Sequence, residues 1–341
     1  MKTWQKITFV VVLVVFVSAS VAISLVSISR PPYKYDEISV SEGAPVDGWE
    51  FYAFNGNNST NSLHIDYVRD KNGNDPDETK PVVAVRKYAV NADEYIREIT
   101  IGAHVKHIDE TAFFNVKKLQ RITVDPANEW FKDIDGVLYS KDGKTLILYP
   151  ICYGEQPTEK EDEFTYPDSY RVPEGVERIN TFAFLKNGNL RDVTLPESLK
   201  EIGDMAFFDC WRLGSYDYDK ANDALLGTGF ALPDSIEKLG SDAFSKCGNI
   251  APVLYIPASV KEIGHHAFFS CGGMKDVYLG AADDTQFESG EAWMPKSIKA
   301  GAMWKAPVPQ YGKERADADQ LIAAYQAETL TRLREEAKEN G

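Results

Sequence analysis

The most informative pattern of apolar and polar positions along the chain is a phrase of 13 residues that occurs five times without gaps. Its consensus is apolar-Pro-x-small-apolar-x-x-apolar-Gly-x-x-Ala-Phe, with Gly102 in place of the proline in the first copy. Phe184 and Phe207 end consecutive copies and are 23 residues apart. A unit of that length cannot bury an apolar face by itself, so the pattern predicts a repeat solenoid with a shared apolar core. The copies occupy residues 101–113, 172–184, 195–207, 232–244 and 256–268.

Each copy predicts the same short elements, as the third copy illustrates. One strand ends at Pro196, because proline cannot donate a hydrogen bond to a neighbouring strand. The apolar pair Leu199 and Ile202 begins a second strand, after which Gly203 permits a sharp turn. Phe207 then lies in a short helical turn and fills the interior, so the expected fold is mainly β with short helical turns. The recurring rings of Phe184, Phe207, Phe244 and Phe268 are expected to form one interior column, with rungs about 4.8 Å apart.

Two segments interrupt the copies. Apolar runs on both sides of Asp142 and Gly143 predict a β-hairpin, because this residue pair favours a tight turn. A second interruption adds 14 residues between Leu213 and Pro233. This insertion is either a grafted binding feature or a flexible acidic loop.

The ends of the solenoid depart from the pattern, as expected of terminal repeats that shield the core. Two alternating apolar segments, WEFYAF and LHIDYV, predict an N-terminal coil, and Trp293, Met303 and Trp304 are candidate capping residues at the other end. The last segment reads as a charged helix that packs on the solenoid end or self-associates weakly. Its narrow apolar stripe consists of Ile322, Tyr325, Leu330 and Leu333. The predicted divisions are residues 1–29 (signal peptide or anchor), 30–48 (polar linker), 49–280 (solenoid with its N-terminal cap), 281–313 (degenerate cap or linker) and 314–341 (C-terminal helix).

The N-terminus predicts export. Residues 7–29 are 23 uncharged, mainly apolar residues, and about 20 suffice for a helix to cross a membrane. A cleaved signal peptide also fits, with Ser20 and Ala22 as the small residues before a cleavage site. Apolar character resumes at Ile23, which favours an uncleaved anchor. Both alternatives place the body outside the cytoplasm, at the cell surface or secreted.

Two phrases, LPESLKEIGDMAFFDC and IPASVKEIGHHAFFSC, resemble the BspA-type leucine-rich repeats of bacterial cell-surface proteins. The segment DGVLYSKDGKTLILYP is similar to a hairpin that recurs within that family. The resemblance covers residues 49–279, and it implies a leucine-rich repeat fold. It also implies an exported or surface-displayed protein, since some members of the family are adhesins or bind host proteins.

Composition narrows the function. The chain has 37 lysines and arginines against 52 aspartates and glutamates, a formal net charge of −15, which disfavours nucleic-acid binding. Four cysteines are too few for a disulfide scaffold. Three of them occupy the same slot of successive copies, and we expect buried free thiols there because stacked rungs seldom give disulfide geometry. These three are Cys210, Cys247 and Cys271.

The groups that could carry chemistry have simpler explanations. His104, His107, Asp109 and Glu110 resemble a metal cluster, but they fall in slots that other copies fill with ordinary surface residues. The segment at 133–136, Asp-x-Asp-Gly, lacks the glycine and glutamate positions of a calcium loop and reads as a turn entering the hairpin. No nucleotide-binding or hydrolase motif is present. We therefore expect no catalytic site, cofactor or metal.

A charge pattern accompanies the second strand of each copy. The two residues inside the apolar pair alternate in sign from copy to copy, which predicts a ladder of opposite charges that fixes the register of stacking. The pairs are Glu177 and Arg178, Lys200 and Glu201, Glu237 and Lys238, and Lys261 and Glu262.

The expected function is adhesin-like and non-catalytic, with an extracellular protein or glycan as the partner and the membrane as a further contact if residues 7–29 are uncleaved. The alternatives are a passive structural spacer or cell-envelope component, and a divergent hydrolase whose residues meet only in the fold. Aromatic residues are enriched at interaction hot spots. The candidate partner-binding residues in or beside the insertion are therefore Trp211, Tyr216, Tyr218 and Phe230.

Overall fold

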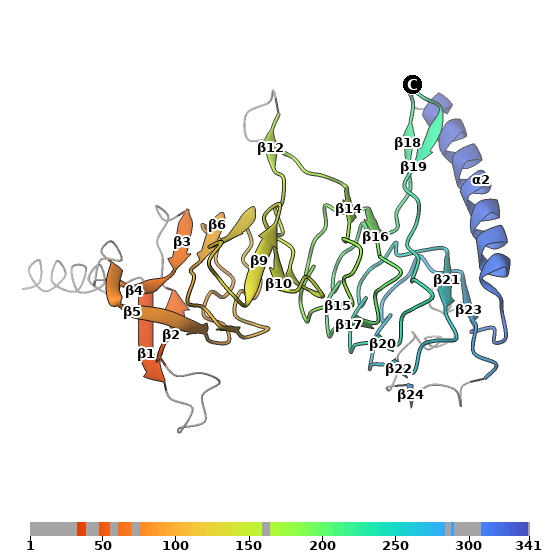
Figure 1. The fold of residues 1–341 in the computed structure, drawn as a ribbon. Helices are drawn as coiled ribbons and strands as arrows, with labels where there is room; N and C mark the ends of the chain where they lie inside the picture. The colour runs from red at the N-terminus through yellow and green to blue at the C-terminus, as the bar shows by residue number, and fades with distance from the viewer. Residues whose placement is uncertain are drawn as a thin grey trace, which may run out of the picture.

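A computed structural model describes residues 33–38, 48–54, 61–69, 76–158, 164–283, 288–289 and 308–339. They form an elongated stack of short strands with one helix, α2 (Arg315–Glu339), at the C-terminal end (Figure 1). The expected anchor or signal at 7–29 and the candidate capping residues Trp293, Met303 and Trp304 lie outside the described residues. Within these ranges no helix has the length and apolar character needed to span a membrane.

One ladder of parallel strands joins the rungs of the C-terminal half. Residue pairs such as Arg178 and Glu201, and then Glu201 and Lys238, lie side by side in it. This confirms the second predicted strand of the last four copies. The parallel ladder runs in the order β24 (Glu288–Ser289), β22 (Glu262–Ile263), β20 (Lys238–Leu239), β17 (Glu201–Ile202), β15 (Arg178–Ile179) and β11 (Thr145–Leu148). Two antiparallel strands, β10 (Val137–Ser140) and β9 (Phe131–Ile134), continue the sheet beyond β11.

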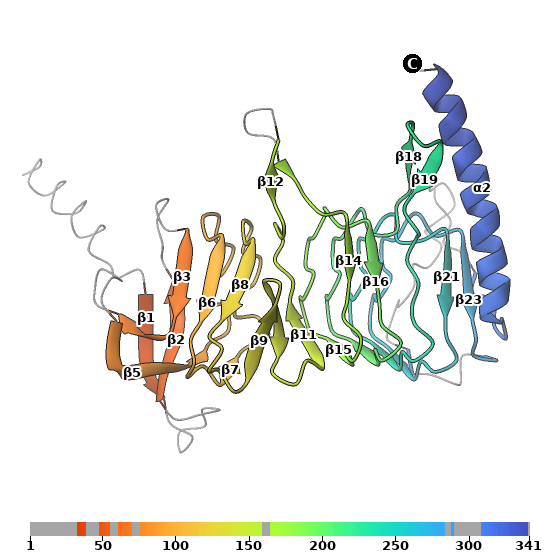
Figure 2. The same ribbon diagram turned by 45° about the horizontal axis from the view of Figure 1, so that its top comes forward.

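The strands before the prolines form a second set of parallel pairs, visible on another side of the stack in Figure 2. Its members are β3 (Ser62–Ile65), β6 (Glu98–Ile101) and β8 (Arg121–Val124), then β14 (Ser169–Arg171) with β16 (Asp192–Thr194), and β21 (Val253–Ile256) with β23 (Asp276–Leu279). These strands form three separate sheets and not one continuous ladder. Between β16 and β21, the residues that lead from the insertion to Pro233 form no strand.

The corner after the glycine is not a helical turn, and that expectation was wrong. Met205 and Asp209 have φ angles of 52° and 62°, and such left-handed residues interrupt a helix. The backbone bonds run between rungs instead: the Phe184 amide donates to the Ala206 carbonyl at 2.7 Å. Gly203 is required here because a Cβ at that position would lie 2.7 Å from the backbone nitrogen of Thr181.

The recurring phenylalanines form the predicted interior column. The ring centroids of Phe184, Phe207, Phe244 and Phe268 are successively 4.6, 5.2 and 5.2 Å apart, and the ring planes differ by 7° or less. All four side chains are buried. Tyr149, from the segment after β11, extends the column with its ring 5.0 Å from Phe184. The stacking distance is close to the strand spacing, as expected when one ring is contributed per rung.

The core is divided, which corrects the expectation of one shared interior. Strand β10 lies at the division: Val137 and Tyr139 belong to the cluster of the C-terminal half, and Leu138 belongs to the N-terminal cluster with Phe113. Successive side chains of a strand point to opposite faces, so one strand closes both clusters. The predicted hairpin of β10 and β11 is confirmed, and β9 extends it through a tight turn at Asp135 and Gly136, with φ of 52° and 88°.

The N-terminal cap has strands in both predicted segments and further strands that were not predicted, β1 (Tyr33–Ile38) among them. The segment expected to be a polar linker contains β1, which pairs antiparallel with β2 (Gly48–Phe54). Its strand character comes from aromatic residues at alternate positions, and Tyr35 packs on Phe51 with ring centroids 5.6 Å apart. The remaining elements of this half are β4 (Tyr67–Arg69), β5 (Pro76–Val85) and β7 (His107–Ile108), followed by the hairpin β12 (Gln156–Pro157) and β13 (Phe164–Thr165).

At the C-terminal end, residues 308–313 continue the stack. Gln310 forms a parallel bridge to Tyr278 of β23, and the Gly312 amide donates to the Ala281 carbonyl at 2.7 Å. Tyr311 packs against the core cluster of the C-terminal half. These residues cover the last rung before the chain enters α2.

Candidate binding surface

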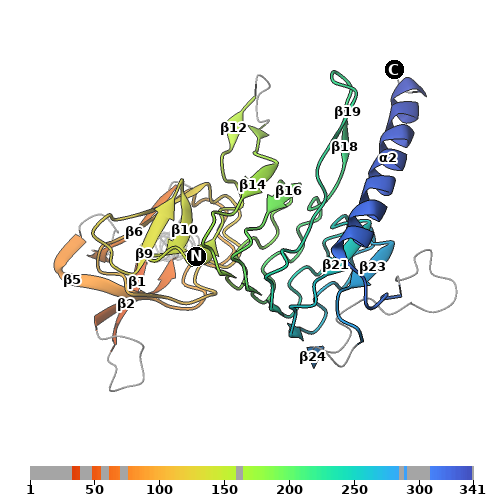
Figure 3. The same cartoon turned by 45° about the vertical axis from the view of Figure 1, so that its right-hand side comes forward.

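The insertion forms an antiparallel hairpin, β18 (Asp217–Asp219) and β19 (Ala224–Leu226), that projects from the stack (Figure 3). Its base is fixed by Arg191, whose side chain is only 8% exposed. The guanidinium pairs with Asp168 at 2.5 Å, with Asp192 at 3.2 Å and with Asp217 at 3.1 Å. The insertion is thus an ordered hairpin whose first strand neutralises a buried charge.

Helix α2 lies beside this hairpin and beside β21, which confirms that it packs on the solenoid (Figure 3). Its attachment is mainly polar, since Ala318 is its one buried residue. Arg315 pairs with Asp234 at 2.5 Å near the start of the helix, and Arg334 pairs with Asp223 of the hairpin tip at 2.7 Å near its end.

Tyr325 makes the middle contact of the helix. Its hydroxyl donates to the Asp276 carboxylate of β23 at 2.9 Å, and partial burial together with this bond raises the pKa of Tyr325 to about 12. The Lys275 ammonium lies 4.6 Å from the centroid of the same ring, a cation–π distance. The helix is therefore held at three places along its length, with space left between them.

A groove lies between the hairpin base, the sides of the last rungs and α2. Its cavity volume is about 580 Å³, within the range of ligand-binding sites. The aromatic and cationic side chains that line it are Trp211, Arg212, Tyr216, Lys275, Tyr325 and Arg332.

Trp211 stands at the edge of this groove and is 55% exposed. It occupies a slot that neighbouring rungs fill with Gly188, Gly248 and Gly272. The absence of a side chain at Gly188 makes room for the indole, because a Cβ there would lie 2.3 Å from the Trp211 Nε1. The glycine at this position of the neighbouring rung therefore leaves space for the exposed indole of Trp211 to lie on the surface.

The four residues predicted for partner binding have different places. Trp211 and Tyr216 both line the groove, and the Tyr216 hydroxyl accepts a hydrogen bond from Gln326 of α2 at 3.4 Å. Tyr218 lies in the hairpin, where its hydroxyl donates to Asp223 at 2.6 Å. Phe230 is 3% exposed and packs on Phe244 with centroids 5.1 Å apart, so this ring is part of the core and is not available to a partner.

Sequence reasoning missed four of the groove side chains named above: Arg212, Lys275, Tyr325 and Arg332. Tyr325 was recognised only as part of the apolar stripe of a helix. The spacing of seven residues between Tyr325 and Arg332 places them on one face of that helix. Nothing in the sequence indicates which rung this face meets.

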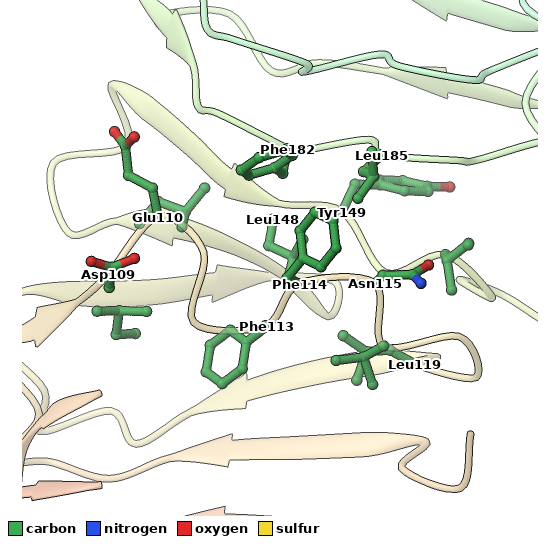
Figure 4. Close-up of a pocket in the computed structure, with 14 residues that line it drawn as sticks. Asp109, Glu110, Phe113, Phe114, Asn115, Leu119, Leu148, Tyr149, Phe182 and Leu185 are labelled. Carbon is green, nitrogen blue, oxygen red and sulfur yellow. The ribbon is translucent and has the colours of Figure 1, made fainter. Parts of the chain in front are cut away.

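A smaller depression lies where the two core clusters meet (Figure 4). Phe113, Phe114, Phe182 and Leu185 line it, and Figure 4 shows the carboxylates of Asp109 and Glu110 to one side of these apolar groups. Its volume is about 40 Å³, which accommodates only a few water molecules. It is a packing gap at the junction of the clusters and too small for a ligand of ordinary size.

The comparisons with known proteins agree with this architecture. The model of the BspA type leucine rich repeat region matches six copies, over residues 80–135, 164–227 and 226–289. The chain belongs to this family. No curated protein matches the chain.

The BspA-type chain is similar to parts of several solved structures. A leucine-rich repeat protein from Eubacterium ventriosum is 19% identical, with a TM-score of 0.44 over 63% of this chain and 53% of that one. The pneumococcal vaccine antigen PcpA is 19% identical, with a TM-score of 0.46 over 72% and 58%. A leucine rich cell surface protein from Faecalibacterium prausnitzii is 20% identical, with a TM-score of 0.42 over 67% and 62%. The chain thus spans between half and two thirds of the length of these relatives.

The histidines and aspartate that resemble metal ligands in the sequence make packing, strand and hydrogen-bond contacts within the BspA-type fold. His104 packs on Tyr67 with ring centroids 5.6 Å apart, and His107 is a residue of β7. The Asp133 carboxylate accepts a hydrogen bond from the Val124 amide at 2.8 Å. Among the described residues, no three His, Cys, Asp or Glu side chains are grouped as a metal site requires.

The repeat cysteines are buried free thiols, as predicted. Each Sγ donates to the phenylalanine carbonyl of the preceding rung: Cys210 to Phe184 at 3.0 Å and Cys247 to Phe207 at 2.9 Å. Burial raises the pKa of Cys247, and it raises the pKa of Cys271 to about 12. The thiols of Cys247 and Cys271 therefore stay protonated, and all three cysteines link neighbouring rungs.

The charge ladder is also present on the BspA-type rungs. Lys238 pairs with Glu262 at 2.9 Å, and Glu237 pairs with Lys261. Lys144 of the loop before β11 extends the ladder beyond the repeats by pairing with Glu177 at 2.9 Å. The prediction of alternating charge along the stack is confirmed.

Proposed function

We propose that this BspA-type repeat protein is displayed outside the cytoplasm and binds an extracellular macromolecule without catalysing a reaction. The uncharged segment at 7–29 and the family resemblance support export. The observation that carries the binding proposal is the groove beside α2, with the exposed indole of Trp211 at its edge. Tryptophan, tyrosine and arginine dominate the energetics of protein interfaces, and all three line this groove.

The binding site is best tested with point variants. Deleting the hairpin would remove Asp217, leave the Arg191 guanidinium with one carboxylate fewer, and disturb the fold. In contrast, the exposed side chain of Trp211 can be truncated without opening the core.

The experiment measures binding of the full chain, purified in mild detergent, to arrays of extracellular proteins and glycans. Trp211→Ala is expected to weaken binding to the authentic partner by roughly tenfold or more, as hot-spot truncations do. Phe269→Ala is the matched control, because Phe269 is a 44% exposed aromatic outside the groove lining. Equal loss in both variants, or no loss in Trp211→Ala, would contradict the proposed site. A chain that binds nothing on the arrays would favour the passive spacer.

A further inference from the structure

The side chains that line the groove differ in charge from the chain as a whole. The chain carries a formal charge of −15, yet Arg212, Lys275 and Arg332 line the groove with one carboxylate, Asp217. That carboxylate accepts from Arg191 and from Arg212, both at 3.1 Å. Cations therefore outnumber carboxylates in the lining itself, while the further carboxylate partners of Arg191 and Arg332 lie just outside it.

Lys275 is the cation most available to a ligand. Its ammonium lies over the ring of Tyr325, which fixes its position without neutralising it. Within the part of the chain that the structure describes, no carboxylate lies within ion-pair distance of the ammonium. Arg332 pairs with Glu336 of its own helix, at 2.6 Å, and its side chain is 59% exposed.

The surface beside the groove lining is open to an extended chain. Next to Trp211, the slots of Gly248 and Gly272 are open, since a Cβ added at either would meet no atom within 4 Å. Pro252 and Tyr216 add apolar surface inside the groove. The groove therefore combines separated cations with an exposed indole and apolar surface between them.

We infer that the groove binds an extended acidic segment of a partner protein, in which carboxylates pair with Lys275 and Arg332 and an apolar side chain packs on Trp211. This inference rests on the proposed function and names the chemistry of its partner. A peptide that alternates acidic and apolar side chains covers both kinds of lining. A polysaccharide with dense negative charge satisfies the cations but offers no apolar side chain for the indole. Opposite charges across an interface also make the association dependent on salt.

The test uses the full chain and three probes: an eight-residue peptide alternating glutamate and leucine, the same peptide with glutamine for glutamate, and heparin as an acidic glycan. Binding is followed by calorimetry and by the indole N–H resonance of Trp211, assigned from its absence in Trp211→Ala. The glutamate peptide is expected to bind at least tenfold more tightly than the glutamine peptide at low salt, and to lose this advantage at high salt. Equal binding of the two peptides, or binding of heparin alone, overturns the inference.

Charge-reversal variants locate the effect. Lys275→Glu is expected to reduce binding of the glutamate peptide about tenfold. Lys246→Glu, the same reversal at an exposed lysine that lies over Phe208 and outside the groove lining, is expected to leave it unchanged. Circular dichroism checks that both variants keep the fold. Equal effects of the two reversals contradict the inference.

The partner found on the arrays separates this inference from the proposed function. If Trp211→Ala loses the partner and Lys275→Glu retains it, the groove is the site but the acidic class is wrong. If both variants retain the partner, the groove is not the site and both proposals fail.

Discussion

At the scale of single residues, some positions of the repeat consensus require a side chain that fills the core, and others require a residue without a side chain because the backbones of neighbouring rungs lie close together. Phe207 and its equivalents fill the core with one ring per rung. Gly203 allows close contact between rungs, where a Cβ would meet the backbone of Thr181. Core packing therefore determines the residue type at the Phe207 position, and the close approach of backbones determines it at the Gly203 position.

Phe207→Ala is expected to destabilise the fold by about 3–5 kcal/mol, because it leaves a cavity between two stacked rings. Urea unfolding followed by circular dichroism measures this loss. Phe269→Ala, which removes a partly exposed ring of the same kind, is expected to change stability by no more than about 0.5 kcal/mol. If Phe207→Ala also costs less than about 0.5 kcal/mol, the phenylalanine column does not stabilise the stack.

The thiol column predicts a specific dependence on pH. The folded Cys271 thiol has its pKa raised to about 12 by burial, so it stays protonated at a pH at which the unfolded thiol ionises. Stability contributed by this residue is complete below the unfolded pKa of about 8.5 and is lost as the pH rises towards 12. The stability cost of Cys271→Ala should therefore shrink, by about 2 kcal/mol between pH 7.5 and 10.5. A cost that is constant over this range would contradict a buried thiol.

At the scale of elements, two-residue strands are too short to fix their own register. We expect the alternating charges of β15, β17, β20 and β22 to fix it, because a rung displaced by one residue would place like charges side by side. The insertion is positioned in another way: its hairpin projects from the stack, and the pairs of Arg191 with Asp192 and Asp217 fix its base.

Exchanging Lys200 and Glu201 is expected to destabilise the stack by about 1–2 kcal/mol, because both residues then face like charges on the neighbouring rungs. Thermal unfolding at low ionic strength measures the effect. In 1 M salt the difference from the parent chain should largely disappear, since the Debye length falls to about 3 Å. An unchanged melting temperature at low salt would count against the ladder.

At the scale of the whole molecule, the fold is a divided stack with a polar helix attached to one side. The hairpin of β10 and β11 closes both core clusters and lets the N-terminal cap join the repeats. Helix α2 buries little apolar surface, so its position depends on a few ion pairs and hydrogen bonds. The groove exists only because the helix is held in place by these contacts.

The attachment of α2 is therefore expected to be sensitive to salt and to loss of its end contacts. The double variant Arg315→Ala, Arg334→Ala should speed cleavage at Glu328 by a glutamate-specific protease several-fold, and 0.5 M salt should do the same to the parent chain. Arg332→Ala is the control, because the ion pair of Arg332 with Glu336 lies within the helix. Equal cleavage rates in all three chains would show that apolar packing holds the helix.

The sequence by itself determined the repeat, the family, the phenylalanine and cysteine columns and the charge ladder. These features recur at fixed spacing, and stacking places equivalent residues of successive units on top of one another without further information. The same reasoning failed for the helical corner, because the left-handed residues at its turns, such as Met205 and Asp209, are not types that favour this conformation as glycine does.

Only the tertiary structure decided the features that do not repeat. It divided the core at β10, buried Phe230 and brought Trp211 and Tyr216 together with Lys275 and Tyr325. The groove joins segments that are far apart in the chain through contacts that occur once, such as the bond between Tyr325 and Asp276. A contact between unrelated segments leaves no period in the sequence, so its residues cannot be aligned with any other copy.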